Sequence, residues 1–267
     1  MSTVLTSQPA PGVTQLTLNR PDVLNAMDED LVSTLHTELD AVAADRDCRV
    51  VVLTGAGRGF CAGLDLRGYG VPAGSEGVGR VQTAMAVQKQ IAALIPRLRS
   101  LPQPVIAAVN GPAAGGGLAL ALGSDIRVAA RSARFNVAFV RIGLSGCDIG
   151  VSWLLPRLVG ASRAWELMLT GRIIDADRAD AIGLVSQVVD DDHLLETAGA
   201  IAAEISANSP YGVAQTKEVM WSQLEIGSLQ AGIDLENRTQ LLAGHTEDMQ
   251  EAMRAFLERR PADFSHR

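Results

Sequence analysis

The stretch VIAAVNGPAAGGGLALAL, residues 105–122, decides the fold class of this chain. Its first five residues are apolar and mostly β-branched, which is typical of a strand that is buried on both faces. Residues 110–117 form a turn that ends in three consecutive glycines, and residues 118–122 then favour a helix. A buried strand that leads through a glycine turn into a helix indicates an α/β protein.

Strand and helix patterns also alternate before this stretch. Residues 13–18 alternate apolar and polar side chains, and residues 49–54 form another β-branched apolar run, so both predict strands. Between them, Asp28 can cap a helix. The apolar side chains of that helix recur on one face at Leu31, Leu35, Leu39 and Val42.

The remaining N-terminal segments complete a core of strand and helix units. Residues 55–79 are rich in glycine and lack periodicity, so we expect a long loop of the kind that often carries function. Helical spacing returns over residues 81–98. Residues 125–129 again resemble a strand, and residues 134–142 are apolar with an uncertain period.

The C-terminal third contains helix patterns with recognisable ends. Candidate N-terminal caps are Ser162, Asp175, Ser209 and Thr246, with a proline after Ser209, and candidate stops are Gly171 and Gly183. We therefore expect an α/β core over residues 1–200 and a helical C-terminal lobe over residues 201–267.

Composition restricts the possible partners. The 267 residues are 47% hydrophobic and carry a net charge of -7, which argues against a broad surface for nucleic acid or an anionic membrane. The cysteines match neither a disulfide framework nor a C-x-x-C site, so we expect a cytoplasmic protein. Residues 1–12 lack the pattern of a signal peptide, and no stretch approaches the ~20 apolar residues that cross a bilayer.

Several common kinds of active site are not supported. The segment after residue 54 begins Gly-Ala-Gly-Arg-Gly-Phe, but Phe60 occupies the third glycine position of a dinucleotide-binding turn. The phosphate-binding loop and the nucleophile elbow of serine hydrolases are absent from the sequence. The histidines are isolated rather than paired at ligand spacing, so we expect no metal site.

Two glycine-rich turns, residues 60–66 and 110–117, each follow a buried strand. Glycine lets a ligand approach the backbone closely, and the second turn also opens a helix with free N–H groups. Such N–H groups can stabilise the enolate oxygen that forms when a proton beside a thioester carbonyl is removed. From the residues alone, this role and simple tight packing are equally good explanations.

A resemblance favours the catalytic explanation. Residues 19–27, 51–66 and 109–126 resemble, in order and spacing, three hallmark stretches of the enoyl-CoA hydratase/isomerase (crotonase) family. The likeness continues through Leu-Pro-Arg-Leu-Val-Gly at residues 155–160 and Thr-Glu-Asp at residues 246–248. It therefore covers nearly the whole chain.

The resemblance implies a crotonase (ClpP-like) spiral of repeated β-β-α units with a C-terminal helical lobe for trimer assembly, as a homotrimer or a dimer of trimers. It implies an acyl-CoA substrate, so coenzyme A enters as part of the thioester rather than as a permanently bound cofactor. By position, the N–H groups of Leu64 and Gly116 form the oxyanion hole. The residues that would line the coenzyme A and acyl pocket are Leu24, Ala26, Ala62, Asp65, Leu66, Gly115 and Phe139. Asp65 could instead be an acceptor that stabilises its loop.

The sequence departs from the family pattern at the two glutamates with which hydratases hold and activate water. Their positions correspond to Ala119 and Phe139, which cannot transfer a proton. Between residues 77 and 165 the only acidic residues are Asp125 and Asp148. Asp125 resembles a structural position, whereas Asp148 lies where related dienoyl-CoA isomerases carry an aspartate, so Asp148 is the candidate catalytic acid/base. It could equally cap the following helix.

The sequence therefore predicts an acyl-CoA-processing enzyme, with isomerase-like chemistry from one carboxylate favoured over hydration by two glutamates. The alternative is an acyl-CoA-binding protein that has lost catalysis. Cys147 is expected to be a small buried residue and Arg141 an exposed one. Arg259 and Arg260 fit the negative end of the last helix and could also reach coenzyme A phosphates.

Overall fold

The computed structural model describes residues 2–70, 74 and 77–266. Its main sheet has the strand order β1-β2-β3-β4-β6-β9, in which β1 and β2 are antiparallel and the remaining pairs are parallel. A small second sheet has the order β5-β7-β8. The strands are β1 (Val4–Ala10), β2 (Val13–Leu18), β3 (Val50–Gly55), β4 (Val105–Val109), β5 (Pro112–Ala114), β6 (Ile126–Ala130), β7 (Arg134–Asn136), β8 (Ile174–Asp175) and β9 (Gln187–Val189).

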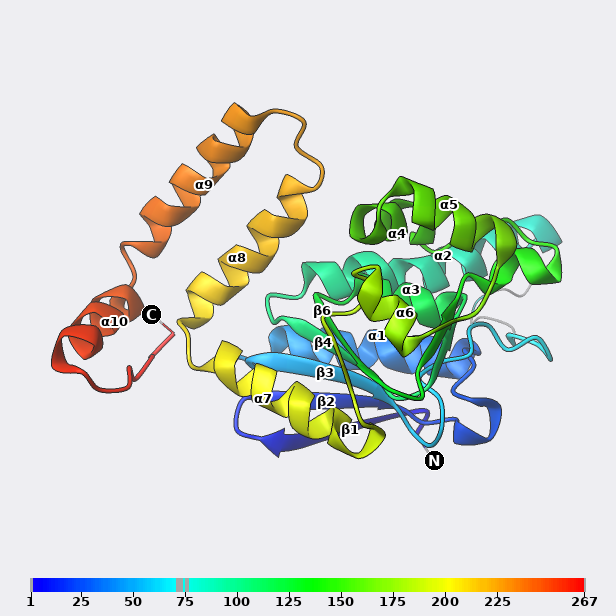
Figure 1. Cartoon of the computed structure of the whole chain (residues 1–267), viewed down its shortest axis with the longest axis horizontal. Helices are drawn as coiled ribbons and strands as arrows, with labels where there is room; N and C mark the ends of the chain where they lie inside the picture. The colour runs from blue at the N-terminus through cyan, green and yellow to red at the C-terminus, as the bar shows by residue number, and fades with distance from the viewer. Residues whose placement is uncertain (1, 71–73, 75–76, 267) are drawn as a thin grey trace.

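The helices up to α7 lie around the main sheet, and the helices after α7 extend away from it (Figure 1). The α-helices are α1 (Glu29–Ala44), α2 (Arg80–Ser100), α3 (Gly116–Gly123), α4 (Val151–Val159), α5 (Ala161–Thr170), α6 (Ala176–Ala181), α7 (Leu194–Ser206), α8 (Pro210–Gln223), α9 (Leu229–Ala243) and α10 (Glu247–Glu258). Short 3-10 turns are η1 (Pro21–Val23), η2 (Ala138–Ile142) and η3 (Asp191–His193).

The sheet separates two apolar cores because successive side chains of a strand point to opposite faces. In β3, Val51 and Leu53 pack with α1, α2 and α3. Val50 and Val52 pack on the other face, where α7 contributes Leu194, Ala198 and Ala202. Burial on both faces explains why β3 and β4 are apolar throughout rather than alternating.

The last three helices extend from the body as a separate arm (Figure 1). Helix α9 follows α8 after a loop and runs back in the opposite direction, and α10 lies at the far end of the arm. The boundary at residues 200 and 201, predicted between core and lobe, falls inside α7. The division into two units stays a prediction.

Most of the expected elements are present, and the mixed α/β class is confirmed. The Asp28 carboxylate caps α1 by accepting a hydrogen bond from the Leu31 N–H. The predicted caps Asp175, Ser209 and Thr246 accept equivalent bonds from the first turns of α6, α8 and α10. These helix starts were predictable because each depends on residues close together in the sequence.

One predicted helix start was wrong. Helix α5 begins at Ala161 after Gly160, with φ 82°, rather than at a Ser162 cap. Gly160 also ends α4, so this single glycine, in a conformation that favours glycine, separates the two helices. The predicted stop at Gly183 is confirmed, because Gly183 follows the C-cap residue Ile182 of α6 with φ 76°. The predicted loop over residues 55–79 runs from β3 to α2, and residues 71–73 and 75–76 lie outside the described part of the chain.

Candidate active site

Three segments that are far apart in the sequence run side by side at one end of the sheet. Met27 forms a parallel bridge with Leu64, and Cys61 forms one with Ala113. The Ala62 N–H donates to the Leu24 carbonyl at 2.9 Å. The resemblance placed the site in these same segments, and the structure brings them into direct contact.

Two asparagine side chains, the buried Asn25 and the partly buried Asn110, hold the turn that precedes the first glycine-rich segment. The Asn25 amide donates to the carbonyl oxygens of Ala56 and Gly59, at 3.0 and 2.7 Å. The Asn110 amide donates to Gly55 and Gly57 at 2.8 and 2.9 Å. Because Asn25 precedes α1 and Asn110 follows β4, these side chains lock all three segments in register. The sequence analysis missed this role.

Leu64 and Gly116 lie on turns that touch. Gly63 has φ 95°, and a Cβ atom added to it would stand 3.5 Å from the Gly116 nitrogen and 2.8 Å from the Ala114 carbonyl oxygen. Only glycine therefore fits at residue 63. The backbone just before Leu64 is in close contact with the backbone of Gly116.

The N–H groups of Leu64 and Gly116 have no hydrogen-bond acceptor among the described residues. Within the described residues, neither donates a hydrogen bond, although nearby N–H groups are used. Asp65 donates to the Met27 carbonyl at 2.9 Å and Gly115 to the Asn136 carbonyl at 3.1 Å. Gly116 is also the first residue of α3, where the helix dipole favours negative charge. Two unused donors on adjoining turns match what an oxyanion site requires.

Apolar side chains surround the Gly116 turn. A Cβ atom on Gly116 would overlap the Met27 methyl group and lie 3.3 Å from Cδ1 of Ile149. Phe139 contacts the equivalent point on Gly115 at 3.3 Å. Ala119 is completely buried in α3. Ala119 and Phe139 are therefore packed apolar side chains.

Asp148 is placed beside this turn by its neighbour. It is half-buried in the loop between η2 and α4, one residue before Ile149. Ile149 has φ 46°, a left-handed conformation that a β-branched residue rarely adopts. The idea that Asp148 caps α4 was wrong, because Gly150 is the cap residue. The Asp148 Oδ1 atom instead accepts hydrogen bonds from the Ile149 N–H at 2.8 Å and from Gln88 Nε2 at 2.5 Å.

The Asp65 carboxylate is engaged by arginines. Arg67 donates to both of its oxygens, at 3.0 and 2.9 Å, and Arg20 donates to one at 3.1 Å. These bonds, chiefly those from Arg67, hold the pKa of Asp65 well below its usual range. Arg20 also pairs with Asp28 at the start of α1. Asp65 thus acts as an acceptor that stabilises its loop, which is the second of the two roles that the sequence left open.

The other predicted pocket residues surround the same backbone. Leu24 and Ala62 are partly buried, Ala26 and Phe139 are buried, and Leu66 is 71% exposed. Cys147 is exposed, so its expected burial was wrong. Arg260 is held by Glu251 and Glu258.

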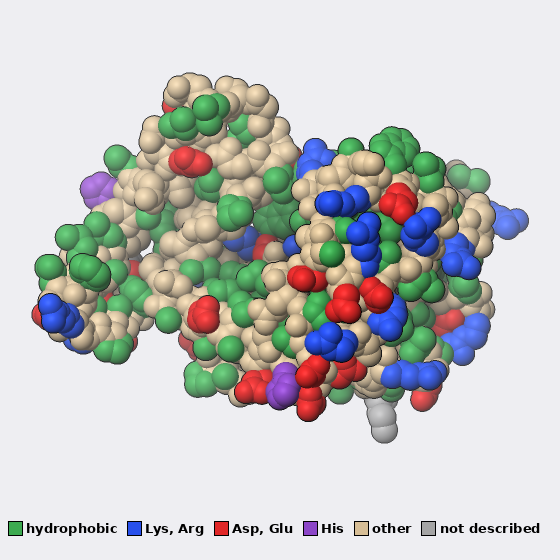
Figure 2. Space-filling view, viewed as in Figure 1, with side chains coloured by type: hydrophobic (Ala, Val, Ile, Leu, Met, Phe, Trp, Pro, Cys, Tyr) green, Lys and Arg blue, Asp and Glu red, His purple; other side chains and the backbone are tan. Residues whose placement is uncertain are grey.

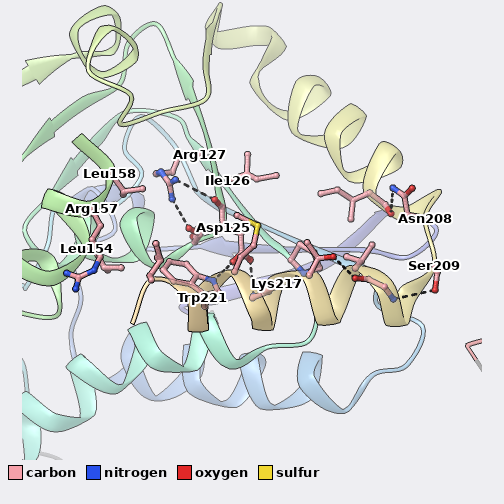
Figure 3. Close-up of a pocket in the computed structure, with 18 of the residues that line it drawn as sticks. Asp125, Ile126, Arg127, Leu154, Arg157, Leu158, Asn208, Ser209, Lys217 and Trp221 are labelled. Atoms are coloured by element: carbon pink, nitrogen blue, oxygen red, sulfur yellow. Dashed lines mark hydrogen bonds and ion pairs between the residues drawn. The ribbon is translucent and has the colours of Figure 1, made fainter. Parts of the chain in front are cut away.

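A large cavity lies elsewhere, between α8 and the body of the protein. Its volume is about 770 Å³, and none of the predicted site residues lines it. Figure 3 shows Lys217 and Trp221 of α8 pointing toward Asp125 at the base of this cavity. Lys217 Nζ lies 2.9 Å from Asp125 Oδ2, and Trp221 Nε1 donates to Oδ1 at 2.7 Å. The Asp125 side chain therefore joins α8 to the core.

The chain belongs to the enoyl-CoA hydratase/isomerase family, whose model matches residues 9–267. Its fold is the crotonase fold. A probable enoyl-CoA hydratase/isomerase from Mycobacterium abscessus superposes with a TM-score of 0.94 at 41% identity, and the match covers 100% of both chains.

Named relatives include both hydratases and isomerases. The chain is 46% identical to the probable enoyl-CoA hydratase EchA12 of Mycobacterium tuberculosis (strain H37Rv), over 99% of this chain and 93% of that protein. It is 42% identical to the 1,2-epoxyphenylacetyl-CoA isomerase of Escherichia coli K12, over 95% of each. The names of similar proteins thus include both hydratases and isomerases of acyl-CoA thioesters.

The described residues form neither a cluster of metal ligands nor a helix that could span a membrane. No cluster of three or more His, Cys, Asp or Glu side chains is arranged to hold a metal ion. In the same part of the chain, no helix is long and apolar enough to cross a membrane.

Proposed function

We propose that this protein transfers a proton next to the carbonyl of an acyl-CoA thioester. The observation that carries the proposal is the pair of unused N–H groups of Leu64 and Gly116 on turns in contact. Both would donate to the thioester oxygen as it becomes an enolate, and the loss of one such donor typically slows a reaction ~100-fold or more. Coenzyme A would enter as part of the substrate and leave as part of the product.

Asp148 is the proposed acid/base. It would remove the proton from C2 of a 3-enoyl-CoA, the electron pair would move into the thioester oxygen, and the same carboxyl would return the proton at C4. The product is the 2-enoyl-CoA, and no water is consumed. This chemistry needs one carboxylate, which fits the apolar Ala119 and Phe139 at the positions matched to the hydratase glutamates.

Two comparisons support isomerisation. The Escherichia coli relative is named as an isomerase. A monofunctional enoyl-CoA isomerase from M. smegmatis superposes with a TM-score of 0.74 at 42% identity, covering 87% of this chain and 99% of that one. The same absence of glutamates at residues 119 and 139 also favours the second candidate, an acyl-CoA-binding protein without catalysis.

The two candidates are separated by exchange and binding measurements on the purified protein. We expect turnover of 3-enoyl-CoA in deuterated water, with deuterium uptake, and its loss in Asp148→Asn. Calorimetry with a saturated acyl-CoA should give the same affinity for both proteins. Asp180→Asn, at an exposed carboxylate on α6, is the control and should behave like the wild type.

Each other outcome has a definite meaning. Tight binding without exchange in the wild type would establish the binding protein. Exchange that continues unchanged in Asp148→Asn would remove Asp148 from the mechanism while leaving the backbone donors in place.

We also propose that the arm formed by α8, α9 and α10 mediates assembly into a homotrimer or a dimer of trimers. Hydrophobic side chains gather over this arm (Figure 2). Leu229, Phe256 and Leu257 are 82%, 83% and 78% exposed, more apolar surface than a monomer usually leaves in contact with water. Sedimentation equilibrium should give the mass of three or six chains, and Phe256→Asp should weaken the assembly. A monomeric wild type would refute this proposal.

A further inference from the structure

The hydrogen bonds of Asp148 are distributed unevenly between its two oxygens. The Gln88 side chain donates to Oδ1 at 2.5 Å, and the Ile149 N–H donates to the same atom at 2.8 Å. No residue that the structure describes donates to Oδ2. Two donors on one oxygen fix the orientation of the carboxylate and leave the other oxygen available for a proton.

Gln88 comes from a helix whose position is fixed on two sides. On one side, Ile95, two turns further along α2, lies close to Gly150: it is 3.7 Å from the position that a Cβ atom on Gly150 would occupy. On another side of the helix, the Gln90 carbonyl bonds to His36 of α1 at 2.9 Å. The Gln90 amide oxygen accepts from the Tyr69 hydroxyl at 3.3 Å. Helix α2 therefore presents Gln88 to the Asp148 loop from a stable position.

The backbone of the loop alone would not determine the orientation of the carboxylate. Ile149 and Gly150 both have positive φ, 46° and 78°, so the chain reverses direction directly after Asp148. The Asp148 carboxylate accepts one hydrogen bond from the N–H of the next residue, Ile149. The hydrogen bond from Gln88 connects it to helix α2.

We propose that Gln88 is a positioning residue that holds Asp148 Oδ1, so that Oδ2 faces the reacting carbons. This inference rests on the function proposed above, and it adds a residue for which the sequence gives no signal. Gln88 is an exposed side chain on a helix, where glutamine is an ordinary surface residue. Its role depends on Asp148, which is 60 positions away in the sequence.

The test is Gln88→Met, which keeps the length of the side chain and removes the donor. We expect kcat for 3-enoyl-CoA isomerisation to fall roughly ten-fold, because a charge-assisted hydrogen bond is lost. KM and the affinity for a saturated acyl-CoA should stay within about two-fold, because Gln88 acts on the base rather than on binding. Gln82→Met, on the same helix, is the control and should match the wild type.

A double variant separates positioning from a general structural effect. In the Asp148→Asn background, Gln88→Met should lower the residual rate no further, because its partner is already impaired. Thermal unfolding should stay within about 2 °C of the wild type, as usual for a change at an exposed helix position.

The failures of the two proposals are distinguishable. A wild-type kcat in Gln88→Met, a loss carried by KM, or an equal loss in both backgrounds overturns the role of Gln88 and leaves the proposed function intact. A wild type without exchange overturns both.

Discussion

Replacing Lys217 with methionine tests how α8 is attached to the core. Lys217 is one of the two lysines in the chain, and its side chain is 4% exposed. Its ammonium lies 2.9 Å from Asp125 Oδ2 and donates to the carbonyl oxygens of Leu98 and Gln103, also at 2.9 Å. Burial lowers the pKa of Lys217, and the neighbouring Asp125 opposes that shift. All of these contacts disappear in the variant.

The expected cost follows from the charge that is left behind. Removing one partner of a buried ion pair typically destabilises a protein by about 3–5 kcal/mol. Asp125 keeps two donors, Trp221 Nε1 and the Val105 N–H, each at 2.7 Å. We therefore expect a loss at the lower end, about 3 kcal/mol, in the free energy of unfolding.

Urea unfolding at a fixed protein concentration measures this loss, since assembly would add to the apparent stability. Lys89→Met, at an exposed position of α2, is the matched control and should change stability by less than about 0.5 kcal/mol. A loss below about 1 kcal/mol would refute this account of the α8 contact.

Two further predictions concern packing and pH. Gly117→Ala should cost more than about 3 kcal/mol or abolish folding, because the new Cβ would overlap the Cys61 carbonyl group; Gly199→Ala on α7, where nothing lies within 4 Å, should stabilise by about 0.5–1 kcal/mol. Hydrogen exchange and urea unfolding measure both, and equal effects would contradict the packing argument. Hydrogen bonds, first from Arg260, lower the pKa of Glu251 from 4.5 to about 2, so its stabilising effect is present above pH 4.5 and is lost as pH falls toward 2. The protection factors of the α10 amides against hydrogen exchange should therefore fall over that pH range in the wild type but not in Glu251→Gln, and identical profiles would exclude this ion pair.

The sequence predicted the elements whose signals are local. Residues 13–18 form a strand whose apolar and polar residues alternate, and residues 105–109 form one that is buried on both faces, and each pattern can be read from neighbouring residues. Asp28 and Thr246 cap helices through bonds to residues three positions ahead. The short strand β5 and the small sheet around it escaped prediction, since three residues of strand have no stable pattern of their own.

The residues of the candidate site also divide into those with a local signal in the sequence and those without one. The glycine turns could be recognised because clusters of glycine mark turns, and Gly63 and Gly115 have the positive φ that favours glycine. The contacts of Gln88 and Asn25 could not, because each joins residues brought together only by the complete fold. Cys147 was misplaced for a related reason: the burial of a loop residue is decided by the helices around it.

The surroundings of the proposed oxyanion site bear on the type of reaction. Ala119 is completely buried, and Phe139 lies 3.3 Å from the position that a Cβ atom on Gly115 would occupy, so these two apolar side chains provide no oxygen to hold a water molecule. A bound water needs two or more polar partners, and addition of water across a double bond needs one group to remove its proton and another to supply a proton to the carbon. Moving a proton from one carbon to another needs a carboxylate held still while the enolate exists. Asp148 is held at Oδ1 by α2 and by its own loop, which is the constraint that the second reaction requires, and on this basis we propose isomerisation rather than hydration.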